Sequence, residues 1–163
     1  MRIGYGFDSH EFRAGVPLKI GGVMLEHDRG LGGHSDGDVL LHAITDALLG
    51  AIAAPDIGAL FPPTEAKWKN ADSAIFLQEA LRRVHKAGYA IGNVDASLIL
   101  AAPKIGPHAA KIREQVAKLL GVKADCVGLK AKTPEGLNLD HAVLAHVVVL
   151  LEKTARKKKR ASR

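Results

Sequence analysis

The feature that most constrains the fold is an apolar run near the end of the sequence, Val147-Val148-Val149-Leu150-Leu151. β-Branched residues are typical of strands, and successive side chains of a strand point to opposite faces of the sheet. A run that is apolar at every position is therefore typical of a strand covered on both faces. We predict a strand over residues 141–152 at the centre of a sheet.

Apolar periodicity and turn residues predict the other elements. Further strands are expected over residues 2–10, 18–25 (with a bulge or turn at Gly21-Gly22), 92–102 and 125–132, the last including Cys126 as a small apolar residue. Helices are expected over residues 38–53, from Asp72 or Ser73 to Ala87, and from Pro107 to a point before Gly121. Residues 28–37 are glycine-rich and residues 55–72 contain three prolines, so both segments are expected to be irregular.

This order mixes strand pairs with helices, which indicates an α+β fold. We expect a single domain with a mixed, mainly four-stranded sheet and helices packed on one face. The second face of that sheet would be apolar and uncovered, and self-association would cover it.

Length and composition are those of one globular domain. The chain has 163 residues, 47% of them hydrophobic, and no run approaches the roughly 20 apolar residues of a membrane span. Its N-terminus lacks the apolar run of a signal peptide, and its single cysteine excludes an internal disulfide. These features predict a cytoplasmic protein with no membrane partner.

The net charge of +6 belongs to the C-terminus. Residues 156–163 hold six Lys or Arg and no acid, and without them the chain has 17 basic and 17 acidic residues. We therefore divide the chain into a domain of residues 1–152 and a basic, disordered tail of residues 153–163. The tail is either solubilising or a non-specific tether for nucleic acid. The chain is only 4% aromatic, which does not favour a nucleic-acid surface.

The first predicted strand carries a candidate metal site. Because residues i and i+2 of a strand share a face, Asp8 and His10 project together, opposite the apolar face. His42, on a predicted helix, is the candidate third ligand. One carboxylate and two imidazoles, with a fourth position open, suit a catalytic zinc ion.

Two carboxylates flank His42 on its helix. Asp38 and Asp46 lie four residues before and after it, on one side of the helix. A carboxylate beside a ligand imidazole fixes its tautomer, so we expect Asp38 and Asp46 to support His42.

Two further segments suit phosphate. His34-Ser35 ends the glycine-rich loop just before a helix, where backbone N–H groups favour an anion, although Ser35 or Asp36 is equally suited to cap the helix. Residues 130–136 follow a strand with two lysines, a hydroxyl and a carboxylate, which suit a phosphate and its divalent cation or an ordinary turn. Residues 101–107 form a rigid loop that by itself is only a connector.

The ordered motifs resemble one family, the 2-C-methyl-D-erythritol 2,4-cyclodiphosphate synthases of the non-mevalonate isoprenoid pathway. The resemblance runs over residues 1–152. It is carried by Gly6-Phe7-Asp8-Ser9-His10, His34-Ser35-Asp36-Gly37-Asp38-Val39, residues 41–50, Asp56-Ile57-Gly58, Phe61-Pro62, Ala71-Asp72-Ser73, Gly92-Asn93-Val94-Asp95 and Ala102-Pro103-Lys104.

The resemblance implies a role for each matching residue. Asp8, His10 and His42 would bind Zn²⁺, and Glu135 would carry a second divalent ion, Mg²⁺ or Mn²⁺. His34 would stabilise the transition state and Thr133 would polarise the phosphates. Substrate would be bound by Ser35, Asp56, Ile57, Gly58 and Phe61, and its cytidine by Leu100, Ala101, Ala102, Pro103, Lys104, Ile105, Gly106, Ala131 and Lys132 of a neighbouring subunit.

The resemblance also implies the reaction. The enzyme would be a phosphorus–oxygen lyase, and its substrate would be 4-diphosphocytidyl-2-C-methyl-D-erythritol 2-phosphate. The 2-phosphate would attack the β-phosphate, which closes a ring and releases CMP. The family is a homotrimer with active sites between subunits.

The sequence departs from the family pattern in two places. Lys132 and Pro134 stand where the family often has threonines. Residues 137–143 stand in place of a Gly-Phe-x-Gly-Arg-x-Glu stretch that the family commonly carries. In the family, its arginine and glutamate face the central cavity of the trimer, so the sequence leaves open whether that cavity binds an isoprenoid-like ligand.

Two rival functions remain open from the residues alone. A zinc phosphoesterase would activate water at the same three ligands and release inorganic phosphate. A non-enzymatic protein would hold a structural metal in a closed four-ligand site and bind nucleic acid through its tail.

Overall fold

Five strands form one mixed sheet in the computed structural model of the protein, which describes residues 1–154. The order across the sheet is β4 (Arg29–Leu31), β1 (Arg2–Ala14), β7 (Ala142–Lys153), β5 (Tyr89–Ile99) and β6 (Val127–Lys132). Only the β5–β6 pair is parallel. The prediction that the strand over residues 141–152 is central is confirmed.

The prediction of a mainly four-stranded sheet is wrong by one short edge strand. β4 lies inside the glycine-rich segment that was expected to be a loop, and it pairs with Phe12–Ala14. β1 therefore continues beyond the predicted residues 2–10. Three residues, Arg-Gly-Leu, are too few to show an apolar alternation, so this strand has no sequence signal of its own.

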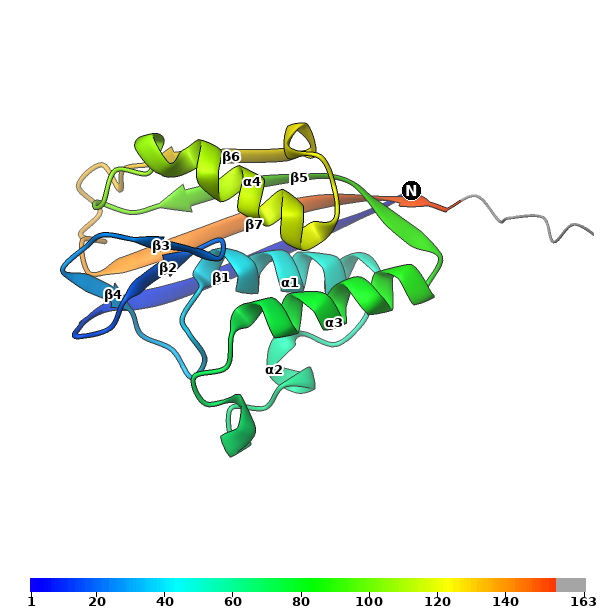
Figure 1. The fold of residues 1–163 in the computed structure, drawn as a ribbon, viewed down its shortest axis with the longest axis horizontal. Coiled ribbons are helices and arrows are strands. Elements are labelled where there is room, and N and C mark those ends of the chain that lie inside the picture. The colour runs from blue at the N-terminus through cyan, green and yellow to red at the C-terminus, as the bar shows by residue number, and fades with distance from the viewer. Residues whose placement is uncertain (155–163) are drawn as a thin grey trace, which may run out of the picture.

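The helices cover one face of the sheet, as expected (Figure 1). They are α1 (Val39–Ala51), α2 (Ile57–Leu60), α3 (Ser73–Lys86) and α4 (Ala109–Leu120), with 3-10 turns at Ala66–Trp68, Gly106–His108 and Ala124–Cys126. α2 and the first of these turns lie in the segment predicted to be irregular. Cys126 ends the last turn rather than lying in β6. A separate hairpin of β2 (Leu18–Ile20) and β3 (Val23–Leu25) turns at Gly21-Gly22.

Glycines in β1 set the distance between α1 and the sheet. A Cβ added at Gly6 would overlap the carbonyl oxygen of Ala43, and one at Gly4 would overlap that of Ala47. Only residues without a side chain allow this approach. α1 therefore lies directly on β1, and its first turns are brought beside Asp8 and His10.

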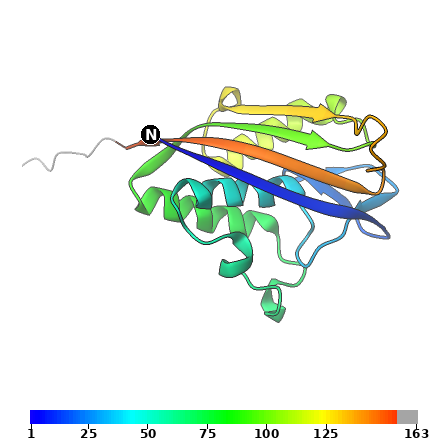
Figure 2. The same cartoon turned by 180° about the vertical axis from the view of Figure 1, so that it is seen from behind.

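The opposite face of the sheet is bare in the single chain (Figure 2). Ile3, Tyr5 and Phe7 of β1 and Val148 of β7 are 44–69% exposed there. The helix-covered face holds the core, including Val147, which is fully buried. The bare face is thus a contiguous apolar surface of β1 and β7, which pair at Tyr5 and Val148.

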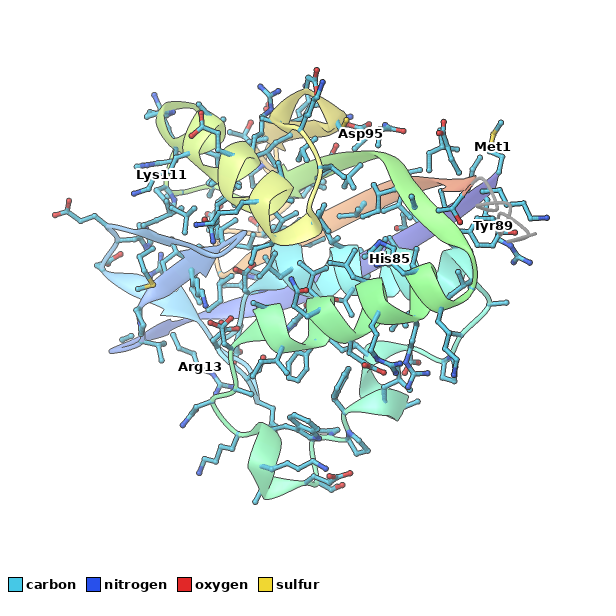
Figure 3. All side chains as sticks on the ribbon, turned by 45° about the vertical axis from the view of Figure 1, so that its right-hand side comes forward. Met1, Arg13, His85, Tyr89, Asp95 and Lys111 are labelled. Carbon is cyan, nitrogen blue, oxygen red and sulfur yellow. The ribbon has the colours of Figure 1, made fainter. Side chains whose placement is uncertain are left out.

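The end of the sheet near the N-terminus is tied by contacts across β1, β5 and β7. Tyr89 lies there beside Met1 (Figure 3), and its hydroxyl accepts a hydrogen bond from Arg2 at 3.2 Å. Thr154 N–H donates to Gly88 O at 2.9 Å. Lys153 ends β7 and Thr154 is hydrogen-bonded to the chain before β5. The rest of the predicted tail, residues 155–163, lies outside the described residues.

Within residues 1–154, no helix has the length and apolar character that crossing a membrane requires.

The contact of α1 with β1 is tested by Gly6→Ala. We expect the overlap with Ala43 to lower the free energy of unfolding by about 1–3 kcal/mol, the range of overpacked cores. Chemical denaturation measures this change. Gly50→Ala is the control, because a Cβ there has only Tyr5 O at 3.7 Å and Ala favours a helix by up to about 1 kcal/mol. A stable Gly6→Ala protein would contradict the close approach.

Candidate active site

Asp8, His10 and His42 point their ligand atoms at one another. Asp8 Oδ2 lies 2.9 Å from His10 Nε2 and 2.9 Å from His42 Nδ1, and the two nitrogens are 3.1 Å apart. β1 supplies the first two residues from one face, and the first turn of α1 supplies the third. The expected juxtaposition of these three side chains is therefore present.

The donor set fits a small divalent metal ion. Tetrahedral zinc with bonds of about 2.0–2.1 Å separates its ligand atoms by about 3.3 Å, close to the spacing of this triangle. The three side chains are 12–27% exposed, so the triangle is largely shielded but reachable. One carboxylate and two imidazoles leave a tetrahedral ion one further position.

Electrostatics favour the charged forms of Asp8 and His10. Burial raises the pKa of Asp8, but hydrogen bonds and positive charge from His10 and His42 outweigh burial and hold that pKa well below its usual range. Burial lowers the pKa of His10, yet the hydrogen bond and charge of Asp8 leave it above its usual value. The carboxylate is thus ionised and ready to ligate a cation.

Two serines face the other nitrogen of His42. Ser73 Oγ lies 2.8 Å from Nε2 and Ser35 Oγ lies 3.0 Å from it. Ser73 is fully buried at the first turn of α3. The sequence analysis placed Ser73 only at the start of a predicted helix, because nothing in the sequence relates it to His42, 31 residues earlier.

Asp38 and Asp46 do not hold His42 as predicted. Asp38 accepts hydrogen bonds from the N–H groups of Gly21, Gly22 and Leu41, at 2.8, 2.6 and 3.1 Å. Asp46 accepts one from Ile57 N–H at 2.8 Å. Burial raises the pKa of both carboxyls, although these N–H groups lower it. The two residues instead anchor the segments around α1.

A cavity of about 200 Å³ opens beside the triad. It is lined by the predicted residues His10, His34, Ser35, His42, Ile57, Gly58 and Phe61, and by Pro63, Trp68 and Phe76, which were not predicted. Asp56 is not among the lining residues. It caps α2, where its carboxylate accepts from Ala59 N–H at 2.8 Å.

Three aromatic rings form one wall of this cavity. Phe61 lies 5.0 Å from Trp68 and 4.6 Å from Phe76 between ring centroids, and His42 lies 6.1 Å from Phe76. Their packing gives the cavity an apolar side next to the polar triad. The sequence analysis assigned neither Phe76 nor Trp68 a role. Phe76 lies on the helix expected from Asp72 or Ser73, and Trp68 lies in a segment expected to be irregular.

A second cavity, of about 320 Å³, lies at the carboxyl ends of β5 and β6. Its lining joins Leu100, Ala101, Pro103, Lys104, Ile105, Gly106 and Pro107 to Ala131, Lys132 and Thr133. The parallel register, with Ile99 opposite Lys132, places the two loops side by side. The predicted nucleoside residues thus share one hollow, except for Ala102, which does not line it.

Thr133 and Glu135 lie together just beyond β6. The Thr133 hydroxyl donates to Glu135 Oε1, and the Glu135 backbone has a left-handed φ of 46°. That conformation is uncommon for a residue with a side chain. Both side chains are exposed, so they are available to a ligand at the edge of the second cavity.

The fold and the site define the class of protein: an α+β enzyme domain with a candidate metal centre and two ligand-sized cavities. A model of the YgbB family matches residues 1–152. The chain therefore belongs to the YgbB family.

Similar proteins carry one name. A 2-C-methyl-D-erythritol 2,4-cyclodiphosphate synthase of Koribacter versatilis is 68% identical over 153 residues, which cover 94% of this chain and 99% of that protein. The enzyme of that name from Aquifex aeolicus is 49% identical, covering 94% and 98%. A solved structure of such a synthase, described as a bound form with CDP, has a TM-score of 0.88 at 42% identity and covers 93% of this chain and 100% of that chain. The family resemblance found in the sequence is confirmed.

The triad is tested by metal binding. We expect about one Zn²⁺ per chain, as one three-residue site provides, and loss of that metal in His42→Ala because two ligands hold it poorly. Metal analysis after dialysis measures the stoichiometry. His34→Ala is the matched control, since His34 lines the same cavity outside the triangle and should keep the zinc. Full zinc content in His42→Ala would refute the assignment.

Proposed function

We propose that this protein converts 4-diphosphocytidyl-2-C-methyl-D-erythritol 2-phosphate to 2-C-methyl-D-erythritol 2,4-cyclodiphosphate and CMP, in the non-mevalonate isoprenoid pathway. Family membership and 68% identity to a synthase of that product support this function. The observation that carries it in this chain is the Asp8, His10 and His42 triangle opening into a cavity, where a substrate phosphate can meet a bound cation.

The substrate carries its own nucleophile, so the reaction requires no general base from the cavity. The 2-phosphate attacks the β-phosphorus and CMP leaves with the electrons of the broken P–O bond. A phosphate anion needs no deprotonation. The 2-phosphate needs to be held close to the negatively charged β-phosphate and in line with the P–O bond that breaks.

Different residues bind the metal ions and the phosphates in this reaction. Asp8, His10 and His42 would hold Zn²⁺, and Glu135 would hold Mg²⁺ or Mn²⁺. When bound, these ions supply positive charge to the phosphate oxygens in the transition state. His34 and Ser35, at the mouth of the first cavity, donate hydrogen bonds to phosphate, and His34 stabilises the transferred group.

The remaining residues hold the two ends of the substrate. Ile57, Gly58 and Phe61 line the cavity beside the triad and enclose the methylerythritol, with Asp56 at the start of α2 hydrogen-bonding a hydroxyl. The second cavity, with Lys104 and Lys132, receives the cytidine. Thr133, held by Glu135, contacts the diphosphate between them.

We also infer a homotrimer with active sites between subunits. The two cavities have no lining residue in common, so one chain presents the two halves of a substrate site separately. The bare apolar face of β1 and β7 supplies a surface for association, since apolar patches of this kind mark contacts between proteins.

The function is tested by product analysis. Purified protein with Zn²⁺ and Mg²⁺ should convert the cytidylyl substrate to CMP and the cyclic diphosphate in equal amounts, measured by ³¹P NMR. Release of inorganic phosphate with no cyclic product would show a phosphoesterase instead. His42→Ala should form neither product.

A second arm of the same assay tests Glu135. The exposed Glu135→Gln variant should keep wild-type zinc, because it lies outside the triad, but should need more Mg²⁺ and turn over more slowly, since an amide oxygen is a poorer ligand for a hard cation. An unchanged Mg²⁺ titration, or loss of zinc, would show that Glu135 does not hold a separate ion.

Assembly is tested by light scattering. We expect a mass of about three chains, the closed cyclic assembly of one repeated interface. Val148→Glu should reduce that mass and the turnover together, because it places a charge on the bare face. Met24→Glu is the control: Met24 is similarly exposed, at 57%, but lies on the hairpin. A monomer with full activity would overturn the shared-site arrangement.

A further inference from the structure

The His42 ring is held at both nitrogens. Nδ1 faces Asp8 and His10, and Nε2 lies 2.8 Å from Ser73 Oγ. A neutral imidazole carries its single proton on one nitrogen. To bind a metal through Nδ1, His42 must carry that proton on Nε2. The group that faces Nε2 must then accept a hydrogen bond rather than donate one.

Asp36 decides which way the Ser73 hydroxyl points. Ser73 Oγ is also hydrogen-bonded to Asp36 Oδ1. An ionised carboxylate only accepts hydrogen bonds, so Ser73 donates its proton to Asp36. The lone pairs of Ser73 Oγ are then left for the Nε2–H group of His42. The hydrogen bonds run in one direction, from His42 to Ser73 to Asp36.

Lys19 keeps Asp36 ionised. Its Nζ lies 2.7 Å from Asp36 Oδ2 and 3.1 Å from Asp72 Oδ1. Ser73 N–H adds a further hydrogen bond to Asp36 Oδ2 at 3.2 Å. Burial raises the pKa of Asp36, but Lys19 and Ser73 outweigh burial and hold it below its usual value.

The backbone holds these side chains in place. Asp36 N–H donates to Ala71 O at 3.0 Å, and Asn70 N–H donates to His34 O at 2.8 Å. The loop before α1 is thereby fastened to the start of α3, where Asp72 caps the helix by accepting from Ala74 N–H at 2.9 Å. Ser73, fully buried, has little freedom to turn away from His42.

Ser35 offers a contrast at the same nitrogen. It lies 3.0 Å from Nε2 but is only half-buried and lines the first cavity. Among the hydrogen bonds of residues 1–154, its hydroxyl has no carboxylate partner that would fix its direction. The Ser35 hydroxyl is therefore free to turn toward a ligand in the cavity, whereas the Ser73 hydroxyl stays hydrogen-bonded between His42 and Asp36.

We propose that Ser73 is a positioning residue, which acts with Asp36 and Lys19 to keep His42 in the Nε2-protonated tautomer and so raises the affinity of the triad for its metal. This inference rests on the metal centre of the proposed function. Ser73 touches neither the metal nor the substrate in this role. It acts only through the imidazole.

The test is zinc affinity, measured by competition with a chelator for the wild type, Ser73→Ala and Ser35→Ala. Ser73→Ala should bind zinc about 10- to 100-fold more weakly, the usual effect of removing a partner of a metal-ligating histidine. Ser35→Ala should stay close to the wild type. Equal affinities for the wild type and Ser73→Ala would overturn the proposal.

A second variant separates tautomer control from a purely structural effect. Asp36→Asn keeps Ser73 and the shape of the site, but its amide can donate to Ser73 Oγ and release the hydroxyl to point at His42. It should also weaken zinc binding. If Ser73→Ala fails to fold, Asp36→Asn decides the question, and wild-type zinc affinity in that variant refutes the proposal.

NMR provides a readout that a structural role would not change. In the zinc-loaded wild type, the His42 Nε2 proton should be visible and exchange slowly with water, and it should exchange faster in both variants. Lower thermal stability with unchanged zinc affinity and exchange would show that Ser73 serves only the fold. A wild type that binds no zinc would instead overturn the metal centre itself.

Discussion

The site depends on the close approach of α1 to β1. Gly6 faces the carbonyl of Ala43, the residue next to His42, and Asp8 follows two residues later on the same face of β1. A methyl group at Gly6 would push α1 outward, and the imidazole of His42 would move away from Asp8 and His10. Core packing tolerates such insertions poorly. The triangle of Asp8, His10 and His42 is thus a consequence of how α1 lies on β1 where Gly4 and Gly6 have no side chains.

Asp38 fastens the other end of the same contact. Its buried carboxylate accepts from Leu41 N–H at the start of α1 and from both glycines of the hairpin turn. A negative charge there is also favoured by the helix dipole. The hairpin, the loop and the start of α1 are therefore joined at one point. This arrangement holds His34 and Ser35 at the mouth of the cavity.

The sequence predicted those elements and residues whose placement follows from a local repeat in the chain. The central strand, the three long helices and the shared face of Asp8 and His10 follow from spacings of two or about four residues. His42 joined this pair as a candidate ligand on a predicted helix and through the family resemblance. What the sequence did not reveal depends on contacts between distant segments. The partners of Asp38 and Asp46 are backbone N–H groups, which every residue has, and Ser73 reaches His42 only after α3 packs on α1. β4 was too short to show any alternation.

The distribution of charge supports the proposal that a single chain holds only part of the substrate site. The cavity beside the triad has no lysine or arginine in its described lining, because Lys19 is committed to Asp36 and Asp72. Two lysines instead line the cavity at the ends of β5 and β6. A substrate with a diphosphate and a second phosphate carries several negative charges, and bringing these phosphates together requires positive charge on more than one side. In the homotrimer that we propose, a neighbouring subunit would place Lys104 and Lys132 opposite the triad and supply this charge. The apolar face of β1 and β7 would then bear on the chemistry as well as on assembly.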